Sequence, residues 1–297
     1  MGTARKDEPG LKGLLQNVGK RKNKRVNKRL SPWLYIPAII IIISLTGYFS
    51  CRERTVEVSL ERELPAERPT EKKVAPQKRM AIIIDDVGYD LAALSAIVAL
   101  DTPITVSILP HCPYSIESAH RARNAGNEVM LHLPMEPHGY PTVNPGEGAL
   151  LVSMSEAEIR SQTEKNIQAV PFISGVNNHM GSRFMECEKQ VSVVFDELQK
   201  QGLFFLDSGT TKDTKGRAVS ATAGIPYAKR DIFLDNGHNL DETVELLRHL
   251  IEKRDAWNTL IVIGHPYHST VRALEATLPL IKEHGIDVVT LSNIIEN

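Results

Sequence analysis

The sequence has 297 residues, of which 42% are hydrophobic and 24% are charged, and its formal net charge is −1. This composition is ordinary for a globular protein, and the near-zero charge excludes the basic balance typical of nucleic-acid-binding proteins. The three cysteines, Cys51, Cys112 and Cys187, have no Cys-x-x-Cys spacing and support neither a disulfide framework nor a cysteine zinc site.

The overall charge balance hides a strong asymmetry at the N-terminus. Residues 20–29 read KRKNKRVNKR, and residues 33–49 read WLYIPAIIIIISLTGYF without a charge. An apolar stretch of this length is at the short end of what crosses a bilayer as a helix, and a basic flank holds its own side in the cytoplasm. We therefore predict a basic cytoplasmic tail over 1–30 and a transmembrane anchor over 31–50. The rest of the chain is then extracytoplasmic, in the periplasm of a Gram-negative cell.

A cleaved signal peptide is the alternative to an uncleaved anchor, because it also combines a basic and an apolar segment. Tyr48 and Phe49 stand where a signal peptidase site needs small residues, and they make Cys51 a poor lipid-attachment site as well. The sequence therefore favours the anchor. Residues 51–78 mix charges with prolines and predict a flexible linker, so the folded domain is expected over 79–297.

Short β-branched runs alternate with amphipathic stretches from residue 80 onward. Strands are predicted over 81–84, 104–109, 128–132, 174–178, 203–207, 231–235, 259–264 and 287–291. Helices are predicted over 91–100, 156–170, 186–202, 240–254 and 270–285. This alternation predicts a largely parallel sheet, either closed into a (β/α) barrel or open and doubly wound. No GxGxxG follows the first strand, so a dinucleotide-binding fold has no specific support.

Polar residues follow nearly every predicted strand. The first strand ends in Asp85-Asp86, and His132, His179 and His265 follow three others. In a parallel barrel these ends lie on one face, where the βα loops build the active site. Asp and His suit zinc or another divalent cation, and three protein ligands plus a water form an open, catalytic geometry. A bound cation would also explain the two adjacent acids at the end of a buried strand.

Five motifs in order resemble the divergent polysaccharide deacetylase family, an offshoot of the carbohydrate esterases that remove N-acetyl groups from chitin-like and peptidoglycan glycans. They are IIIDDVG, GNEVMLHLPMEP, GVNNHMGSRF, FFLDSGTT and VIGHPY. The resemblance covers about residues 79–295. It implies a distorted (β/α) barrel of about seven parallel strands, preceded here by the anchor and linker, with a divalent-metal hydrolase site.

The resemblance also assigns roles to individual residues. Asp85 matches the position of the catalytic base, and Asp86 and His132 match metal ligands. The position of the second metal-binding histidine holds Glu136, which is a departure from the main deacetylase pattern. We expect His179 to replace the missing ligand, whereas the alternative is that Glu136 coordinates directly or hydrogen-bonds to a ligand.

His265 matches the general acid of the family, and Asp207 matches an acid that orients this histidine. Asn178 and Ser182 are expected, with Glu136, to support the ligands. The expected function is removal of N-acetyl or related acyl groups from an envelope polysaccharide, with Zn²⁺ as the leading cofactor. The alternatives are a membrane-anchored glycan-binding module without catalysis and a metal-dependent amidase or esterase for another acyl group. Nucleic acid is not an expected partner.

Overall fold

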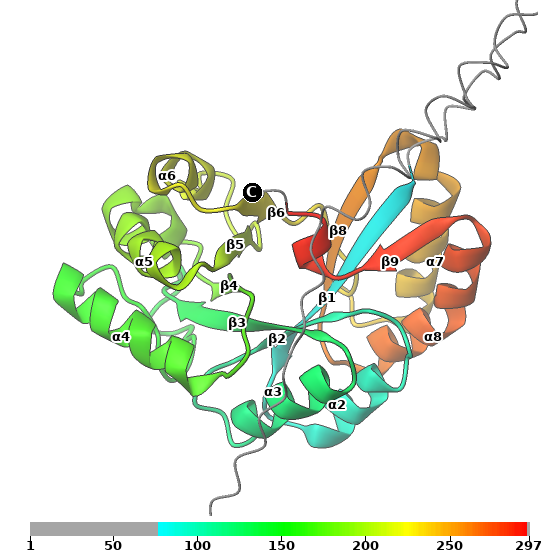
Figure 1. Ribbon diagram of the computed structural model, residues 1–297, viewed down its shortest axis with the longest axis horizontal. Coiled ribbons are helices and arrows are strands. Elements are labelled where there is room, and N and C mark those ends of the chain that lie inside the picture. The colour runs from blue at the N-terminus through cyan, green and yellow to red at the C-terminus, as the bar shows by residue number, and fades with distance from the viewer. Residues whose placement is uncertain (1–76, 296–297) are drawn as a thin grey trace, which may run out of the picture. The chain divides into compact units, whose positions relative to one another are not determined.

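Nine parallel strands form the centre of the protein in the computed structural model, which describes residues 77–295 (Figure 1). The strands are β1 Lys78–Val87, β2 Thr105–Ile108, β3 Glu128–Met135, β4 Gly175–Met180, β5 Phe204–Asp207, β6 Tyr227–Lys229, β7 Ile232–Phe233, β8 Thr259–Gly264 and β9 Ile286–Val289. Each of the eight predicted strands is present, whereas β6, with only three residues, lies outside every predicted range.

The sheet curls around β1, which pairs with β8 along one edge and with β2 and β9 along the other. The strand order is β6-β5-β4-β3-β2-β1-β8-β7, so β6 and β7 are the two ends of the path. Within the described residues these two ends share no ladder of hydrogen bonds. The parallel α/β prediction is confirmed, but the sheet has nine strands rather than about seven and is a curled, partly open barrel.

The α-helices cover only one face of the sheet (Figure 1). They are α2 Leu91–Val98, α3 Ser115–Asn124, α4 Glu156–Ala169, α5 Glu188–Gln201, α6 Gly216–Ala223, α7 Leu240–Glu252 and α8 His268–Glu283. Three short 3-10 helices also occur in the described residues, η2 Phe184–Glu186, η3 Arg254–Ala256 and η4 Leu291–Asn293, and η4 packs against the opposite face through Leu291. The five helices expected from periodicity are therefore present, with ends that move by at most a few residues.

Alternate residues of each strand enter two different cores. Ile82 and Ile84 of β1 belong to the large cluster that the helices cover, and we call this side the outer face. Ala81 and Ile83 belong to a smaller cluster inside the curl, the inner face. The inner cluster contains no residue of an α-helix, which argues against the doubly wound alternative.

Local capping explains where several helices begin. Asp90 Oδ1 accepts a hydrogen bond from Ala92 N at the start of α2. Ser155 and Glu158 form a capping box at the start of α4, in which each side chain satisfies a free backbone N–H of the first turn. Gly202, in the left-handed conformation, ends α5 as a C-terminal glycine commonly does.

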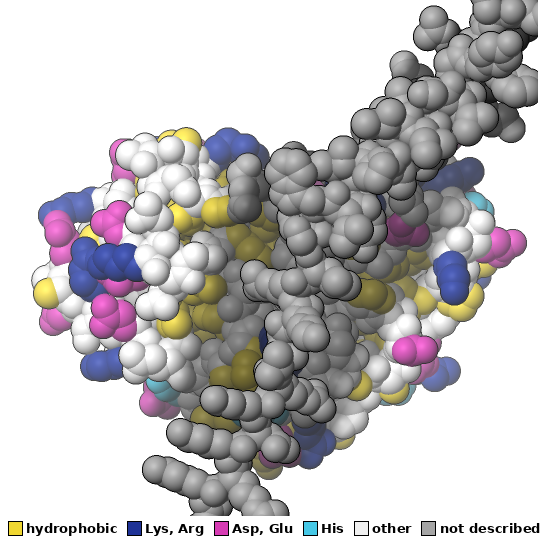
Figure 2. Space-filling view, viewed as in Figure 1, with side chains coloured by type: hydrophobic (Ala, Val, Ile, Leu, Met, Phe, Trp, Pro, Cys, Tyr) yellow, Lys and Arg dark blue, Asp and Glu magenta, His cyan; other side chains and the backbone are white. Residues whose placement is uncertain are grey.

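The predicted anchor over 31–50 lies outside the described residues, as does the linker up to residue 76. Among residues 77–295, no helix has the length and hydropathy needed to cross a membrane. Figure 2 shows Lys, Arg, Asp and Glu side chains intermixed on the surface at the left and right of the view, in keeping with the near-zero net charge.

Replacing Ile82 by alanine should destabilise the domain strongly, because this side chain is fully buried in the large core. We expect the free energy of unfolding to fall by about 2–5 kcal/mol, measured by urea denaturation. Ile116 is 60% exposed on α3 and provides the matched control. Ile116→Ala should change the same quantity by less than about 0.5 kcal/mol, and equal effects of the two substitutions would contradict the assigned core.

Candidate metal centre

The alternation of the strands brings polar side chains from distant parts of the chain onto the inner face. Asp85 follows the inner-facing Ile83 at the strand period of two, and His132 follows the inner-facing Met130 in the same way. His265 continues the inner-facing positions of β8 just past its last residue. Because all strands are parallel, these side chains meet at the carboxyl end of the sheet.

A β-bulge allows Asp86 to join the same group as Asp85. In a regular strand two adjacent side chains point to opposite faces. The pairing of β1 with β2 shifts between Ile84 and Val87, so that β1 contains one extra residue there. Asp86 adopts the left-handed conformation with φ of 57°. Both carboxylates consequently approach His132 Nε2, Asp86 Oδ1 at 3.1 Å and Asp85 Oδ2 at 3.8 Å.

Asp86, His132 and His179 form a cluster that could hold a metal ion. Asp86 Oδ1 lies 2.9 Å from His179 Nδ1 and 3.1 Å from His132 Nε2, and the two ring nitrogens are 3.1 Å apart. Zinc ligands at about 2.0–2.1 Å in a tetrahedral site lie roughly 3.3 Å apart, so a small outward movement accommodates the ion. Within residues 77–295, Asp86 Oδ1 is a buried oxygen that accepts no hydrogen bond, as expected of an atom that serves an ion.

Asn177 orients both a metal ligand and the neighbouring acid. Its Oδ1 lies 2.8 Å from His132 Nδ1 and accepts a hydrogen bond from Ser107 Oγ at 2.5 Å. Its Nδ2 donates to Asp85 Oδ1 at 2.8 Å and to Ser208 Oγ at 3.3 Å. An amide oxygen can only accept, so His132 carries a proton on Nδ1, and Nε2 is the nitrogen that can bind an ion once it has lost its own proton.

The cluster is rich in negative charge. Burial raises the pKa of Asp85, although His132 opposes the shift. Burial also disfavours ionised Asp86, but its short contacts with His132 and His179 outweigh this and hold its pKa well below the usual range. Burial favours neutral His132, yet the charges of Asp85 and Asp86 raise its pKa to about 9. The apo cluster therefore retains a proton that a cation would displace.

His265 is held at the edge of the cluster by Asp235. Its Nδ1 lies 2.9 Å from Asp235 Oδ1, and Asp235 Oδ2 accepts hydrogen bonds from the His265 backbone N–H at 2.6 Å and from Thr270 Oγ1 at 2.7 Å. His265 Nε2 lies 3.9 Å from Asp86 Oδ2. Burial favours the neutral ring, but Asp235 outweighs it and raises the pKa of His265.

The predicted pairing of Asp207 with His265 is wrong. Asp207 has the same strand parity as Phe205 and therefore lies on the outer face. Its Oδ2 accepts hydrogen bonds from Thr214 Oγ1 at 2.6 Å and Tyr227 Oη at 2.8 Å, and its Oδ1 accepts one from Gly209 N. Asp207 thus fixes the loop after β5, and Asp235 has the position at His265 that the sequence analysis gave to Asp207.

Three residues expected to support the ligands hold loops instead. Glu136 Oε1 pairs with Arg183 at 2.7 Å and its Oε2 accepts a hydrogen bond from Val152 N at 2.7 Å, so it does not belong to the three-residue cluster. Asn178 lies on the outer face and accepts a hydrogen bond from Ser208 N through its Oδ1. Ser182 Oγ accepts a hydrogen bond from His138 N.

Asn177 and Asp235 were not predicted as site residues. Asn177 lies within the predicted strand over 174–178, and Asp235 ends the predicted strand over 231–235. Asp235 is the last residue of DIFLD, the predicted strand over 231–235, and is another acid at a strand tip. Asn177 comes directly before Asn178, which was the predicted site residue. Adjacent side chains of a strand point to opposite faces, so Asn177 lies on the inner face and Asn178 on the outer face. A count of strand parity from the apolar residues would have found both.

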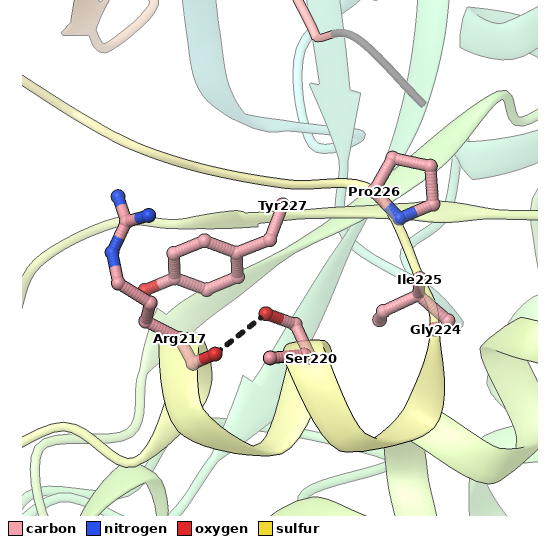
Figure 3. Close-up of a pocket in the computed structure, with 7 residues that line it drawn as sticks. Arg217, Ser220, Gly224, Ile225, Pro226 and Tyr227 are labelled. Atoms are coloured by element: carbon pink, nitrogen blue, oxygen red, sulfur yellow. Dashed lines mark hydrogen bonds between the residues drawn. The ribbon is translucent and has the colours of Figure 1, made fainter.

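A separate pocket of about 540 Å³ lies between α6 and β6. Figure 3 shows Tyr227 and Arg217 on one side of it and Ile225 and Pro226 on the other. None of its lining residues belongs to the metal cluster. The pocket is therefore separate from the metal cluster.

Comparison with known proteins agrees with the geometry. Residues 82–295 match the divergent polysaccharide deacetylase family. The chain is 33% identical to YibQ of Escherichia coli K12 over 197 residues, which is 66% of this chain and 61% of that protein. It is 33% identical to a protein of Haemophilus influenzae over 223 residues, covering 74% of this chain and 78% of the relative.

The fold also matches a solved structure. The crystal structure of protein ATU2773 from Agrobacterium tumefaciens C58 superposes with a TM-score of 0.70 at 22% identity, covering 75% of this chain and 91% of that protein. At this identity the similarity establishes a shared fold and nothing further. Since the family match extends over most of the described domain, the chain belongs to the divergent polysaccharide deacetylase family.

Proposed function

We propose that the protein is a zinc-dependent hydrolase that removes N-acetyl groups from an envelope polysaccharide. The observation that carries this proposal is the cluster of Asp86, His132 and His179 with His265 Nε2 only 3.9 Å from the carboxylate of Asp86. Two imidazoles and a carboxylate match the donor set of open catalytic zinc sites. Family membership supplies the polysaccharide as substrate class.

Asp85 is the proposed general base. A zinc ion held by the cluster would supply a Lewis acid for the acyl carbonyl and for the attacking water. Burial raises the pKa of Asp85 and makes its carboxylate a stronger base, while the hydrogen bond from Asn177 fixes its orientation. Asp85 takes one proton from the water, and the water oxygen forms the new bond to the acyl carbon.

His265 is the proposed general acid. Asp235 accepts a hydrogen bond from His265 Nδ1–H, so the ring presents Nε2–H to the cluster when it is charged. His265 donates this proton to the sugar nitrogen as the carbon–nitrogen bond breaks. The products are acetic acid, which ionises to acetate at neutral pH, and a free amine. The proton that Asp85 took from the water then returns to His265 through solvent, which restores both groups for the next cycle.

The proposed cellular location of the catalytic domain rests on the N-terminal sequence. An anchor over 31–50 with a basic cytoplasmic flank would place the catalytic domain outside the cytoplasmic membrane, next to cell-wall glycan. The direct test is acetate release from N-acetylated peptidoglycan fragments by the zinc-loaded chain. Stoichiometric zinc together with glycan binding but no acetate would instead favour the non-catalytic glycan-binding module.

Removing one cluster ligand should abolish zinc binding and activity together. For Asp86→Asn and His179→Gln we expect at least a ~100-fold loss of zinc affinity, because each removes one of three donors, and acetate release at background level. His249→Gln on the exposed side of α7 is the matched control and should behave as the unmodified protein. Retention of zinc and activity by both ligand variants would contradict the assigned site.

Zinc binding should depend on pH through His132. Because the pKa of His132 is raised to about 9 in the apo cluster, the ring is protonated below that pH and must lose its proton to bind zinc. The apparent dissociation constant should therefore fall about tenfold for each unit of pH increase below pH 9, with about one proton released near pH 7. Calorimetry in buffers of different ionisation enthalpy measures both, and a pH-independent affinity would count against the proposal.

Asp235→Asn should move the alkaline limit of activity. Without the carboxylate the pKa of His265 falls, so the acid loses its proton at lower pH. The alkaline limb of the kcat profile should therefore shift to lower pH. Asp207→Asn is the comparison, because the side chain of Asp207 accepts hydrogen bonds from Gly209, Thr214 and Tyr227 and not from His265. It should leave this limb in place, and the opposite pattern would reinstate Asp207 as the partner of His265.

A further inference from the structure

Basic side chains without acidic partners gather in the segment that includes α6 and β6. Residues 212–230 contain one acidic residue, Asp213, and five basic ones: Lys212, Lys215, Arg217, Lys229 and Arg230. Within the described domain none of the five forms an ion pair with a carboxylate. This segment therefore carries positive charge that no carboxylate of the described domain pairs with.

Arg230, directly after β6, is the most firmly held of these side chains. Its Nε donates to Ser208 O at 2.7 Å and its Nη2 to Gly209 O at 3.3 Å. Its Cζ lies 3.5 Å from the centre of the Phe233 ring. The guanidinium is thus fixed in plane by two carbonyls and an aromatic face, while Nη1 donates to no other residue in 77–295.

Arg230 is connected to both sides of the proposed reaction site. The Ser208 side chain accepts a hydrogen bond from Asn177, which also binds Asp85. The Phe233 ring is stacked with His265 at 5.9 Å between centroids. Partial burial lowers the pKa of Arg230, and the charges of Asp85 and Asp207 oppose this shift.

Burying part of a guanidinium group while some of its N–H donors lack partners costs free energy, and an anion that accepts hydrogen bonds from those donors offsets this cost. A carboxylate is the complementary group, because it accepts two parallel hydrogen bonds from the planar fork of arginine. Asp85 and Asp86 would otherwise repel an acidic substrate from the cluster. The positive charge of Arg230 offsets this repulsion for a substrate whose carboxylate lies on the β6 side of the site.

We propose that Arg230 is a substrate-binding residue that selects carboxylate-bearing N-acylated glycans over neutral ones. The glycan part of this statement rests on the proposed function, and the selection for a carboxylate rests on Arg230 and its surroundings. Lys229 lies beside the same loop, because a side chain built on Gly209 would approach Lys229 Cε at 3.3 Å and Arg230 Nη2 at 3.1 Å. It adds a second positive charge at this position.

The test compares two ligands that differ only in the carboxyl group. Calorimetry of the full chain should use an N-acetylglucosamine/N-acetylmuramic acid tetrasaccharide and the same tetrasaccharide with its carboxyl groups reduced to alcohols. We expect the acidic form to bind at least about tenfold more tightly, with a preference that declines as salt increases. Arg230→Gln should reduce this preference to about twofold or less. Arg248→Gln, which removes an exposed charge from α7, should retain it.

Equal affinity of the native chain for the two tetrasaccharides would overturn the proposal, and so would a preference that survives in Arg230→Gln. The native comparison needs no variant, so a misfolded Arg230→Gln does not leave the question open. Binding is measured without turnover. A carboxylate preference without acetate release would therefore contradict the hydrolase and support the Arg230 subsite, whereas acetate release without a preference would do the reverse.

Discussion

The two-residue alternation of a parallel strand is the constraint on which the site depends. It sends Ile82 and Ile84 into the helix-covered core and Ile83 and Asp85 into the curl. The same parity brings polar side chains from β3, β4 and β8 to one place, although they are far apart in sequence. The bulge at Asp86 is the exception that completes the site, because it turns a residue of the opposite parity toward the histidines.

Much of the fold was predictable because eight of the nine strands and five of the seven α-helices in the described residues carry their own local pattern of apolar residues. The three-residue β6 was missed because so short a segment has no pattern, and the opening between β6 and β7 depends on how all the strands curl together. In the site, Asp85, Asp86, His132, His179 and His265 were identified as residues that meet. Asp207 was wrongly predicted as the partner of His265, because the assignment followed a family motif and did not consider which face of the strand Asp207 occupies. The β-bulge that turns Asp86 toward the histidines has no recognisable pattern in the local sequence.

The electrostatics of the site explain why these residues act together. Asp85 and Asp86 are adjacent and largely buried, an arrangement that repulsion and desolvation disfavour unless positive charge compensates it. A proton on His132 provides that compensation in the apo cluster, and a cation would provide it during catalysis. Arg230 would compensate the negative charge of a substrate carboxylate in the same way, since its guanidinium is held in place on the side of the site formed by β5, β6 and β7.

The central claim is that Asp86, His132 and His179 hold a catalytic zinc ion. It is tested most directly by a crystal structure of the zinc-loaded chain with anomalous diffraction recorded on both sides of the zinc absorption edge. We predict one zinc ion within about 2.0–2.2 Å of Asp86 Oδ1, His132 Nε2 and His179 Nδ1, with a fourth position open toward Asp85 and His265. Zinc coordinated by Glu136 in place of His179, or bound away from this cluster, would contradict it.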